Sequence, residues 1–130
     1  MKIGFCVVNY SEKPLEEVVK LAADNGYDCV ELPAYVGNGQ VDVEDILKNH
    51  KAGEVKKMVE SYGMTIASLS NHADSPLIMG PYSDGTVSSC KGTREEKIQF
   101  GTESMIRSAQ LAAELGVPAV VAFSGMENYG

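Results

Sequence analysis

A glycine followed at once by a short apolar run occurs three times along this chain, each time after a stretch with helical spacing of apolar residues. Glycine commonly ends a helix, and a short apolar run between turn signals is typical of a buried strand. Together with an opening strand over residues 2–8, the pattern predicts four strands that alternate with helices. The three later runs follow Gly26, Gly63 and Gly116.

The predicted helices begin at recognisable residues. Pro14 suits the first position of a helix, and Asp42 can cap a short helix that runs through Leu47. Thr93 and Glu96 have the spacing of a capping box, which opens the longest helix. Apolar positions at helical spacing predict two buried stripes. The first comprises Leu15, Val18, Val19 and Ala22, and that of the longest helix comprises Ile98, Met105, Ile106 and Ala109.

Short apolar strands separated by helices indicate a parallel sheet with right-handed crossovers. Two architectures fit this order, an open doubly wound sheet and the N-terminal half of a (β/α)8 TIM barrel. Side-chain alternation along the strands favours the barrel, because it predicts a polar inner face and an apolar outer face. The predicted inner residues are Cys29, Glu31, Ser68, Ser70, His72, Ala122 and Ser124. The predicted outer residues are Val30, Leu32, Leu69, Val121 and Phe123.

Composition narrows the class of protein. The 130 residues are enough for one domain, residues 1–130, and 44% hydrophobic with 22% charged residues is ordinary for a soluble globule. The net charge of -7 argues against binding to a nucleic-acid backbone and favours a small polar substrate. Neither a membrane-spanning run nor a signal peptide is apparent, so we expect a cytoplasmic protein. The three widely spaced cysteines are expected to be free packing residues.

His72 is the strongest candidate for catalysis, because it follows the third predicted strand at the end where parallel α/β folds bind their ligands. Its imidazole could transfer a proton near neutral pH, or it could merely cap the strand. The long segment from His72 to Gly92 also suits an active-site loop. Asn71 points the other way by alternation and is expected to fix this loop.

Three further residues are candidates for substrate binding. Glu31 lies in an otherwise apolar strand, where a carboxylate is costly to bury unless it is paired. It could bind a substrate hydroxyl or make an internal hydrogen bond that helps to close the barrel floor. Asn9 and Ser124 end the first and fourth predicted strands and could offer hydrogen bonds to a polyol. No metal ligand can be assigned in this chain.

Several motifs, taken in order, resemble the sugar phosphate isomerase/epimerase family, a xylose isomerase-like TIM barrel group that also includes endonuclease IV. The resemblance extends from Lys2 to Gly125. The motifs are Lys2-Ile3-Gly4-Phe5, Gly26-Tyr27-Asp28-Cys29-Val30-Glu31-Leu32, Leu69-Ser70-Asn71-His72, Ser75-Pro76-Leu77-Ile78-Met79-Gly80-Pro81, Gly92-Thr93-Arg94-Glu95-Glu96-Lys97, Leu115-Gly116-Val117-Pro118 and Phe123-Ser124-Gly125.

The resemblance implies a fragment of a metal-dependent isomerase or epimerase that moves a proton next to the carbonyl of a sugar or sugar phosphate. The complete barrel would use a divalent metal (Mn, Mg, Zn or Co) held by residues of its later strands, so we expect no cofactor and no activity for this chain alone. An alternative is a non-catalytic half-barrel that associates with a second copy or pairs with a missing C-terminal half. An endonuclease IV-like DNA repair activity is a third possibility, against which the acidic charge argues.

Overall fold

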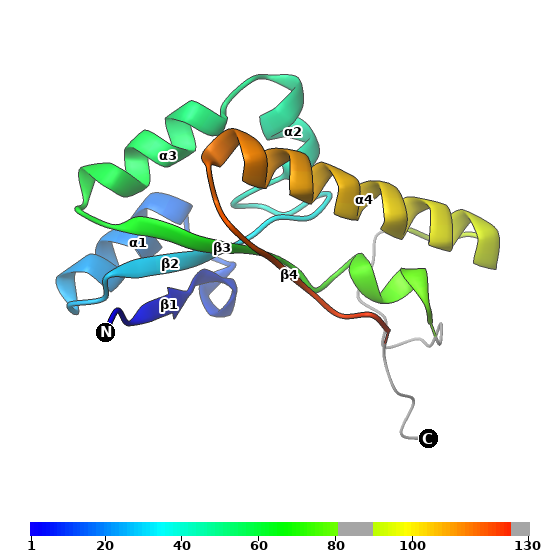
Figure 1. The fold of residues 1–130 in the computed structure, drawn as a ribbon, viewed down its shortest axis with the longest axis horizontal. Coiled ribbons are helices and arrows are strands. Elements are labelled where there is room, and N and C mark those ends of the chain that lie inside the picture. The colour runs from blue at the N-terminus through cyan, green and yellow to red at the C-terminus, as the bar shows by residue number, and fades with distance from the viewer. Residues whose placement is uncertain (81–89, 126–130) are drawn as a thin grey trace.

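A four-stranded parallel sheet forms the centre of the protein in a computed structural model that describes residues 1–80 and 90–125. The helices gather on one side of this sheet and leave the other side open (Figure 1). In chain order the elements are β1 (Gly4–Cys6), the 3-10 helix η1 (Val7–Tyr10), α1 (Leu15–Asp24), β2 (Cys29–Pro33), α2 (Val43–Lys48), α3 (Ala52–Ser61), β3 (Thr65–Asn71), the 3-10 helix η2 (Ser75–Ile78), α4 (Arg94–Leu115) and β4 (Val120–Ala122).

The strands lie side by side in the order β1-β2-β3-β4, which is also their order along the chain. All three pairs are parallel, so each connection must cross back over the sheet through a helix. A doubly wound sheet would reverse its strand order at a switch point and carry helices on both faces. The sequential order with helices on one face is that of half a TIM barrel, and the predicted fold class is confirmed.

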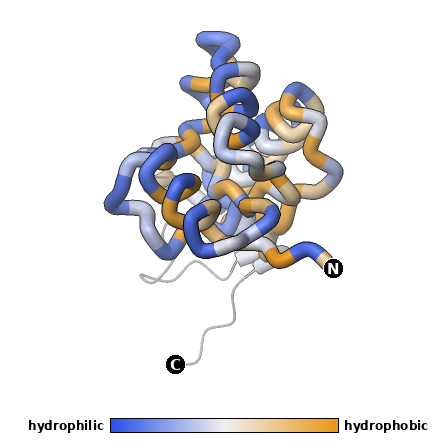
Figure 2. Tube along the Cα trace, turned by 90° about the vertical axis from the view of Figure 1, so that its left-hand side faces the viewer, coloured by the Kyte–Doolittle hydropathy of each residue, from blue (hydrophilic) through white to orange (hydrophobic). Residues whose placement is uncertain are grey.

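The hydrophobic core lies between the sheet and its helices. It includes the predicted stripe of α1, in which Val18, Val19 and Ala22 are fully buried. From β2 and β3 the residues Val30 and Leu69 point into the same core. Hydrophobic and hydrophilic positions alternate every few residues along the helical turns (Figure 2), as expected for helices that cover one face of a sheet.

The predicted starts of α2 and α4 are confirmed, whereas α1 begins at Leu15 with Pro14 as its N-cap, one residue later than predicted. The strand starts are confirmed only in part. Asp42 accepts hydrogen bonds at the start of α2, and Thr93 with Glu96 forms the capping box of α4. The predicted opening strand is too long, because β1 comprises only Gly4–Cys6 and the chain then turns into η1. The long connection after His72 contains η2, and its residues 81–89 lie outside the described part of the chain.

Within the described residues, no helix combines the length and apolar character needed to cross a membrane.

The predicted buried stripe of α4 is wrong. Ile106 and Ala109 are exposed, whereas Ile98 and Met105 are only partly covered. The buried side of α4 is one that hydrophobic periodicity does not reveal, because serines occupy two of its positions and bond to polar groups at the end of β3. The buried residues are Gly101, Ser104, Ser108, Leu111, Ala112 and Leu115.

The predicted alternation along the fourth strand is also wrong. In a parallel sheet paired residues point to the same face, and Ser70 of β3 pairs with Val121 of β4. Val121 therefore shares the open face with Ser70, and Phe123, two residues on, contacts the ring of His72. Val120 packs against the core instead. The prediction placed polar residues inward, but the register that packs Val120 against the core turns Val121 and Phe123 to the open face.

Candidate functional site

His72 directly follows β3, at the carboxyl edge of the sheet. Its side chain is half-buried, and its ring centroid lies 4.6 Å from that of Phe123 with an angle of 32° between the ring planes. The backbone amide of Phe123 donates a hydrogen bond to the Ser75 hydroxyl at 3.0 Å, which ties the end of β4 to η2. The imidazole thus packs against the Phe123 ring at the rim of the sheet's open face.

Asn71, the neighbour of His72, is fully buried and points to the opposite side. Its amide nitrogen donates to the hydroxyls of Ser104 and Ser108 in α4, each at 3.0 Å. Its carbonyl oxygen accepts from the backbone amides of Asp74 and Ser75 at 3.1 and 3.3 Å. The prediction that Asn71 fixes the loop after β3 is confirmed, and the same bonds hold the backbone next to His72.

Glu31 lies on the open face in the middle of β2 and is partly buried. One carboxylate oxygen accepts a hydrogen bond of 2.7 Å from Ser68 of β3, and the other accepts from the Cys6 thiol of β1 at 3.5 Å between S and O. Burial raises the pKa of the Cys6 thiol, with a smaller contribution from the nearby Glu31 carboxylate. Cys6 is therefore a neutral donor that, with Ser68, orients Glu31 across three strands.

The structure does not bring Glu31 and His72 together. Glu31 pairs with Ser68, and His72 lies four residues further along the neighbouring strand. At about 3.3 Å per residue, the two positions are roughly 13 Å apart along the sheet. Both lie on the open face, so Glu31 belongs to its floor and His72 to its rim.

Asn9 and Ser124, the other two candidates, lie beyond the carboxyl ends of the outer strands. Asn9 is part of η1, and Ser124 comes two residues after the end of β4. Both are exposed to solvent. They are at the same end of the sheet as His72, which is compatible with the predicted contact to a polyol but does not test it.

The described residues do not fit a metal ion. Among them, no three His, Cys, Asp or Glu side chains come close enough together to hold one. On the open face, Cys6 and Glu31 bring together one thiol, whose pKa is raised, and one carboxylate. A divalent ion needs several deprotonated donors, so this pair serves as a hydrogen-bonded support.

Comparison with known proteins agrees with this architecture. The sequence profile of a family described as xylose isomerase-like TIM barrel matches residues 19–129, from the middle of α1 past the end of β4. The chain belongs to this family. A search of curated proteins found none whose sequence matches this chain.

Three solved structures share the fold of this xylose isomerase-like chain. A sugar phosphate isomerase/epimerase from Parabacteroides distasonis is 22% identical over 98% of this chain, with a TM-score of 0.57. A second one from the same organism is 20% identical over 98% of the chain, with a TM-score of 0.54. The probable 3-DHS dehydratase involved in petrobactin synthesis from Bacillus anthracis is 15% identical over 95%, with a TM-score of 0.58.

The chain spans less than half of each of these proteins, since the match covers 43%, 41% and 38% of their chains, respectively. At these identities the likeness concerns the fold, which is that of the N-terminal half of a TIM barrel.

Two features of the site escaped prediction from the sequence. The first is the trio of Cys6, Glu31 and Ser68, which needs the strand register to be known. The second is the polar cluster at the end of β3, in which Ser104 also donates to Asp74 at 2.6 Å. A faint signal for it exists, because two serines four residues apart in a helix lie on one face.

Proposed function

We propose that this chain forms the substrate-side wall of a metal-dependent sugar or sugar-phosphate isomerase/epimerase, an enzyme that moves a proton next to a carbonyl. The observation that carries the proposal is the position of His72, half-buried at the carboxyl rim of a half-barrel of the xylose isomerase-like family. Ligands of TIM barrels bind at this rim. The sugar phosphate isomerase/epimerases from Parabacteroides distasonis lend further support through their fold.

In this proposal His72 transfers a proton to or from the substrate. An imidazole changes its charge near neutral pH, which suits general acid-base catalysis. Contact with Phe123 restricts the rotation of the His72 ring and shields one of its faces from water. The rim of the sheet would thereby present a proton-transfer group beside an aromatic ring.

Glu31 would bind a substrate hydroxyl deeper on the open face, and Asn9 and Ser124 would bind others at the rim. A carboxylate has about four acceptor positions, of which Cys6 and Ser68 use two. Glu31 can therefore accept a further hydrogen bond from a sugar.

The divalent metal (Mn, Mg, Zn or Co) belongs to the complete barrel in this proposal. Its ligands would come from strands that this chain does not contain, since the described residues do not fit such a site. When bound, the ion would polarise the substrate carbonyl. We expect the 130-residue chain to be inactive alone and to need its complementary half for turnover.

Proton transfer next to a carbonyl can be measured as incorporation of deuterium from D2O into a ketose. We would use D-ribulose with Mn2+ and follow the exchange by NMR, first with this chain alone and then with the chain joined to the later strands of a family member. We expect exchange only in the joined protein, and a loss of at least about a hundredfold with His72→Ala, the range of general acid-base contributions. Exchange by the chain alone, or full activity of His72→Ala in the joined protein, would contradict the proposal.

A second candidate function is a non-catalytic half-barrel that associates through its edges. The observation in its favour is that β1 and β4 are both edge strands in the described structure, and unpaired edges favour association. DNA repair of the endonuclease IV type is disfavoured by the net charge of -7. Salt-sensitive binding to DNA would revive that possibility.

A further inference from the structure

The loop that connects β2 to α2, residues 34–42, lies at the carboxyl end of the sheet. Because β2 lies between β1 and β3, this β2–α2 loop is next to the connections that follow both neighbouring strands. One of these connections carries Asn9 in η1, and the other carries His72 directly after β3. The β2–α2 loop is therefore placed to link the two parts of the rim to which the candidate site residues belong.

The β2–α2 loop is a closed unit that its own hydrogen bonds hold together. Its two ends meet where Tyr35 and Asp42 form a parallel bridge. In its middle Asn38 is buried, and its Oδ1 accepts hydrogen bonds from the backbone amides of Gln40 at 2.9 Å and Val41 at 2.7 Å. The ends and the centre of the loop are thus both fixed, as in compact loops whose own side chains pack inside them.

One side chain of this loop holds the end of η1. The amide nitrogen of Gln40 donates to the backbone carbonyl of Tyr10 at 2.9 Å and to that of Lys13 at 2.8 Å. An amide nitrogen has two hydrogens, so both of its donors are used. Tyr10 directly follows Asn9 and ends η1. Gln40 therefore fixes the backbone immediately after the candidate residue.

The opposite side of the loop is tied to the connection that carries His72. The backbone amide of Val36 donates to Oδ2 of Asp74 at 3.1 Å. Asp74 comes two residues after His72 and is 1% exposed. The same Oδ2 accepts a hydrogen bond of 2.6 Å from Ser104 of α4. The β2–α2 loop thus joins the segment after Asn9 to the segment after His72.

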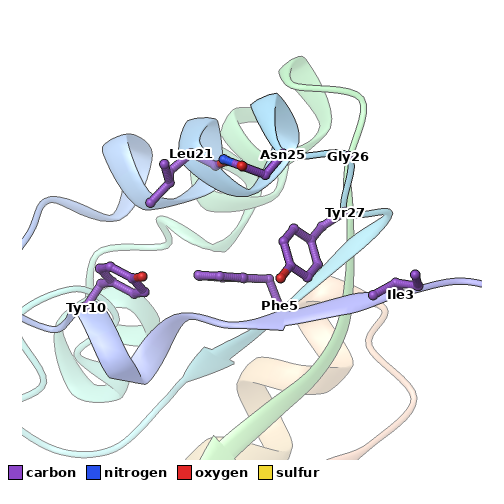
Figure 3. A pocket seen from close by; sticks show the side chains of 7 residues that line it. All are labelled: Ile3, Phe5, Tyr10, Leu21, Asn25, Gly26 and Tyr27. Atoms are coloured by element: carbon purple, nitrogen blue, oxygen red, sulfur yellow. The ribbon is translucent and has the colours of Figure 1, made fainter.

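Tyr10 has a second support of a different kind. Its ring lies 5.6 Å from that of Phe5 in β1, and the Phe5 ring lies between those of Tyr10 and Tyr27 (Figure 3). Such aromatic contacts hold the side chain of Tyr10, whereas Gln40 holds its carbonyl. Loss of the Gln40 bonds should therefore leave η1 attached to the sheet but less exactly placed.

The side-chain oxygen of Gln40 helps to separate placement from stability. Within the described residues, Oε1 of Gln40 is buried and accepts no hydrogen bond. An unpaired buried acceptor costs free energy, which offsets part of what the two donor bonds contribute. Methionine has a similar length and lacks both the donors and this acceptor. Gln40→Met should therefore change the overall stability little while it removes the two bonds to η1.

We propose that Gln40 is a positioning residue, which fixes Asn9 at the rim relative to His72 through the β2–α2 loop. It does not itself touch the substrate. Its two bonds set the place of η1, and the bond between Val36 and Asp74 sets the place of the loop. This inference deepens the function proposed above and rests on it, because it treats Asn9 as a residue that binds a substrate hydroxyl.

The first measurement is amide hydrogen exchange by NMR in the 130-residue chain. The Lys13 amide, which donates to the Tyr10 carbonyl, should exchange roughly threefold to tenfold faster in Gln40→Met, the effect of losing a typical hydrogen bond. The Val41 amide should not change, since its acceptor is Asn38. Gln99→Met is the matched control, because Gln99 is an exposed residue of α4 that bonds to Glu103. Urea unfolding should show that both variants fold.

The second measurement uses the chain joined to the later strands of a family member, with deuterium exchange followed at increasing concentrations of D-ribulose. Gln40→Met should raise KM by roughly threefold to tenfold and change kcat by less than about twofold, because a contact equal in ground and transition state is weakened. Asn9→Ala should do the same, and the double variant should add little, since one contact is lost in all three. A merely structural role would lower the amount of folded enzyme and leave KM unchanged.

Equal exchange of the Lys13 amide in Gln40→Met and the wild type would overturn the proposal. An unchanged KM, or fully additive effects of Gln40→Met and Asn9→Ala, would also contradict it. The proposed function fails separately, when the joined protein exchanges no deuterium or keeps full activity with His72→Ala. In a joined protein without exchange, the Lys13 amide alone decides whether Gln40 holds η1.

Discussion

Asn71 contributes two donors and two acceptor positions to one buried cluster and so connects β3, η2 and α4. All four of its hydrogen bonds go to groups within the protein, and the side chain is fully buried. Ser108 extends the cluster to the residue that follows β2 by donating to the carbonyl of Ala34 at 2.8 Å. A buried polar group is costly only when unpaired, so this cluster stabilises the rim as long as it is complete.

Replacement of Asn71 by Ala should destabilise the chain by about 2–4 kcal/mol, because the backbone amides of Asp74 and Ser75 lose their acceptor inside the protein. Urea unfolding followed by circular dichroism measures the free energy of unfolding. The matched control is Asn49→Ala, which removes an exposed bond to Asp45 and should cost less than about 0.5 kcal/mol. Equal losses in the two variants would contradict the role given to Asn71.

Cys6 offers a prediction on pH dependence. Burial raises the pKa of its thiol, so at any pH near the ordinary cysteine value of about 8.5 a smaller fraction is thiolate than in an unfolded chain. The rate of alkylation by iodoacetamide, resolved by mass spectrometry, should therefore reach half its maximum at a higher pH for native Cys6 than for the same peptide in urea. Glu31→Gln should lower that midpoint only in part, since burial is the larger cause. A native midpoint at or below the unfolded one would refute this account.

At the scale of elements, the contact between α4 and η2 depends on the absence of a side chain at Gly101. A Cβ atom at this position would lie 2.8 Å from the carbonyl oxygen of Asp74 and 3.1 Å from the Leu77 Cβ. Glycine is unfavourable within a helix by about 1 kcal/mol relative to alanine. The cost is offset here by the close approach that lets Ser104 reach Asp74.

Gly101→Ala should therefore destabilise the protein by roughly 1–3 kcal/mol in spite of its better helix propensity, because α4 must move away from η2. Gly53→Ala in α3 is the matched control, since a Cβ atom at that position would have no neighbouring atom within 4 Å. That substitution should stabilise the chain by up to about 1 kcal/mol. Thermal or urea unfolding of both variants tests the opposite signs, and a stabilised Gly101→Ala would be the contrary outcome.

The elements differ in how far the sequence predicts them. The glycine signals, Asp42 and the Thr93–Glu96 box depend on local backbone chemistry, which acts through neighbours in the chain, and all are confirmed. The buried side of α4 is determined by partners at the end of β3, about 30 residues away in sequence, and hydrophobic spacing does not encode it. Which side chains of β4 point to the open face follows from its register with β3, and this register is also a tertiary property.

The site shows the same division. His72 could be placed at the rim because it directly follows a predicted strand, whereas the partners of Glu31 required the register of β1, β2 and β3. Sequence alone left open whether Glu31 is bonded internally, and the structure supplies the two donors. Its contact with a substrate, like those of Asn9 and Ser124, stays a prediction.

For the whole molecule, the order of the strands implies a gradient of stability across the sheet. Within residues 1–80 and 90–125, β2 and β3 are hydrogen-bonded to a neighbour on both sides, whereas β1 and β4 each have one neighbour and comprise three residues. The largest fully buried side chains of the sheet, Leu32 and Leu69, also belong to the two central strands. Local opening should therefore begin at the two edges, at β1 and at β4 beside His72.

Native-state hydrogen exchange should show this gradient directly. We expect amides of β2 and β3 to exchange most slowly, near the rate set by global unfolding, and those of β1 and β4 to exchange through local opening of lower free energy. Val18 and Val19 in α1 serve as an internal reference, because they are fully buried in the core. Measurement at two protein concentrations shows whether another copy of the chain covers an edge strand. Amide exchange at a covered edge becomes slower as the concentration rises, whereas exchange at an uncovered edge does not change. Protection of β1 equal to that of β2 at both concentrations would contradict the gradient. Addition of a complementary half-barrel should slow amide exchange at β1 and β4 and leave exchange at β2 unchanged.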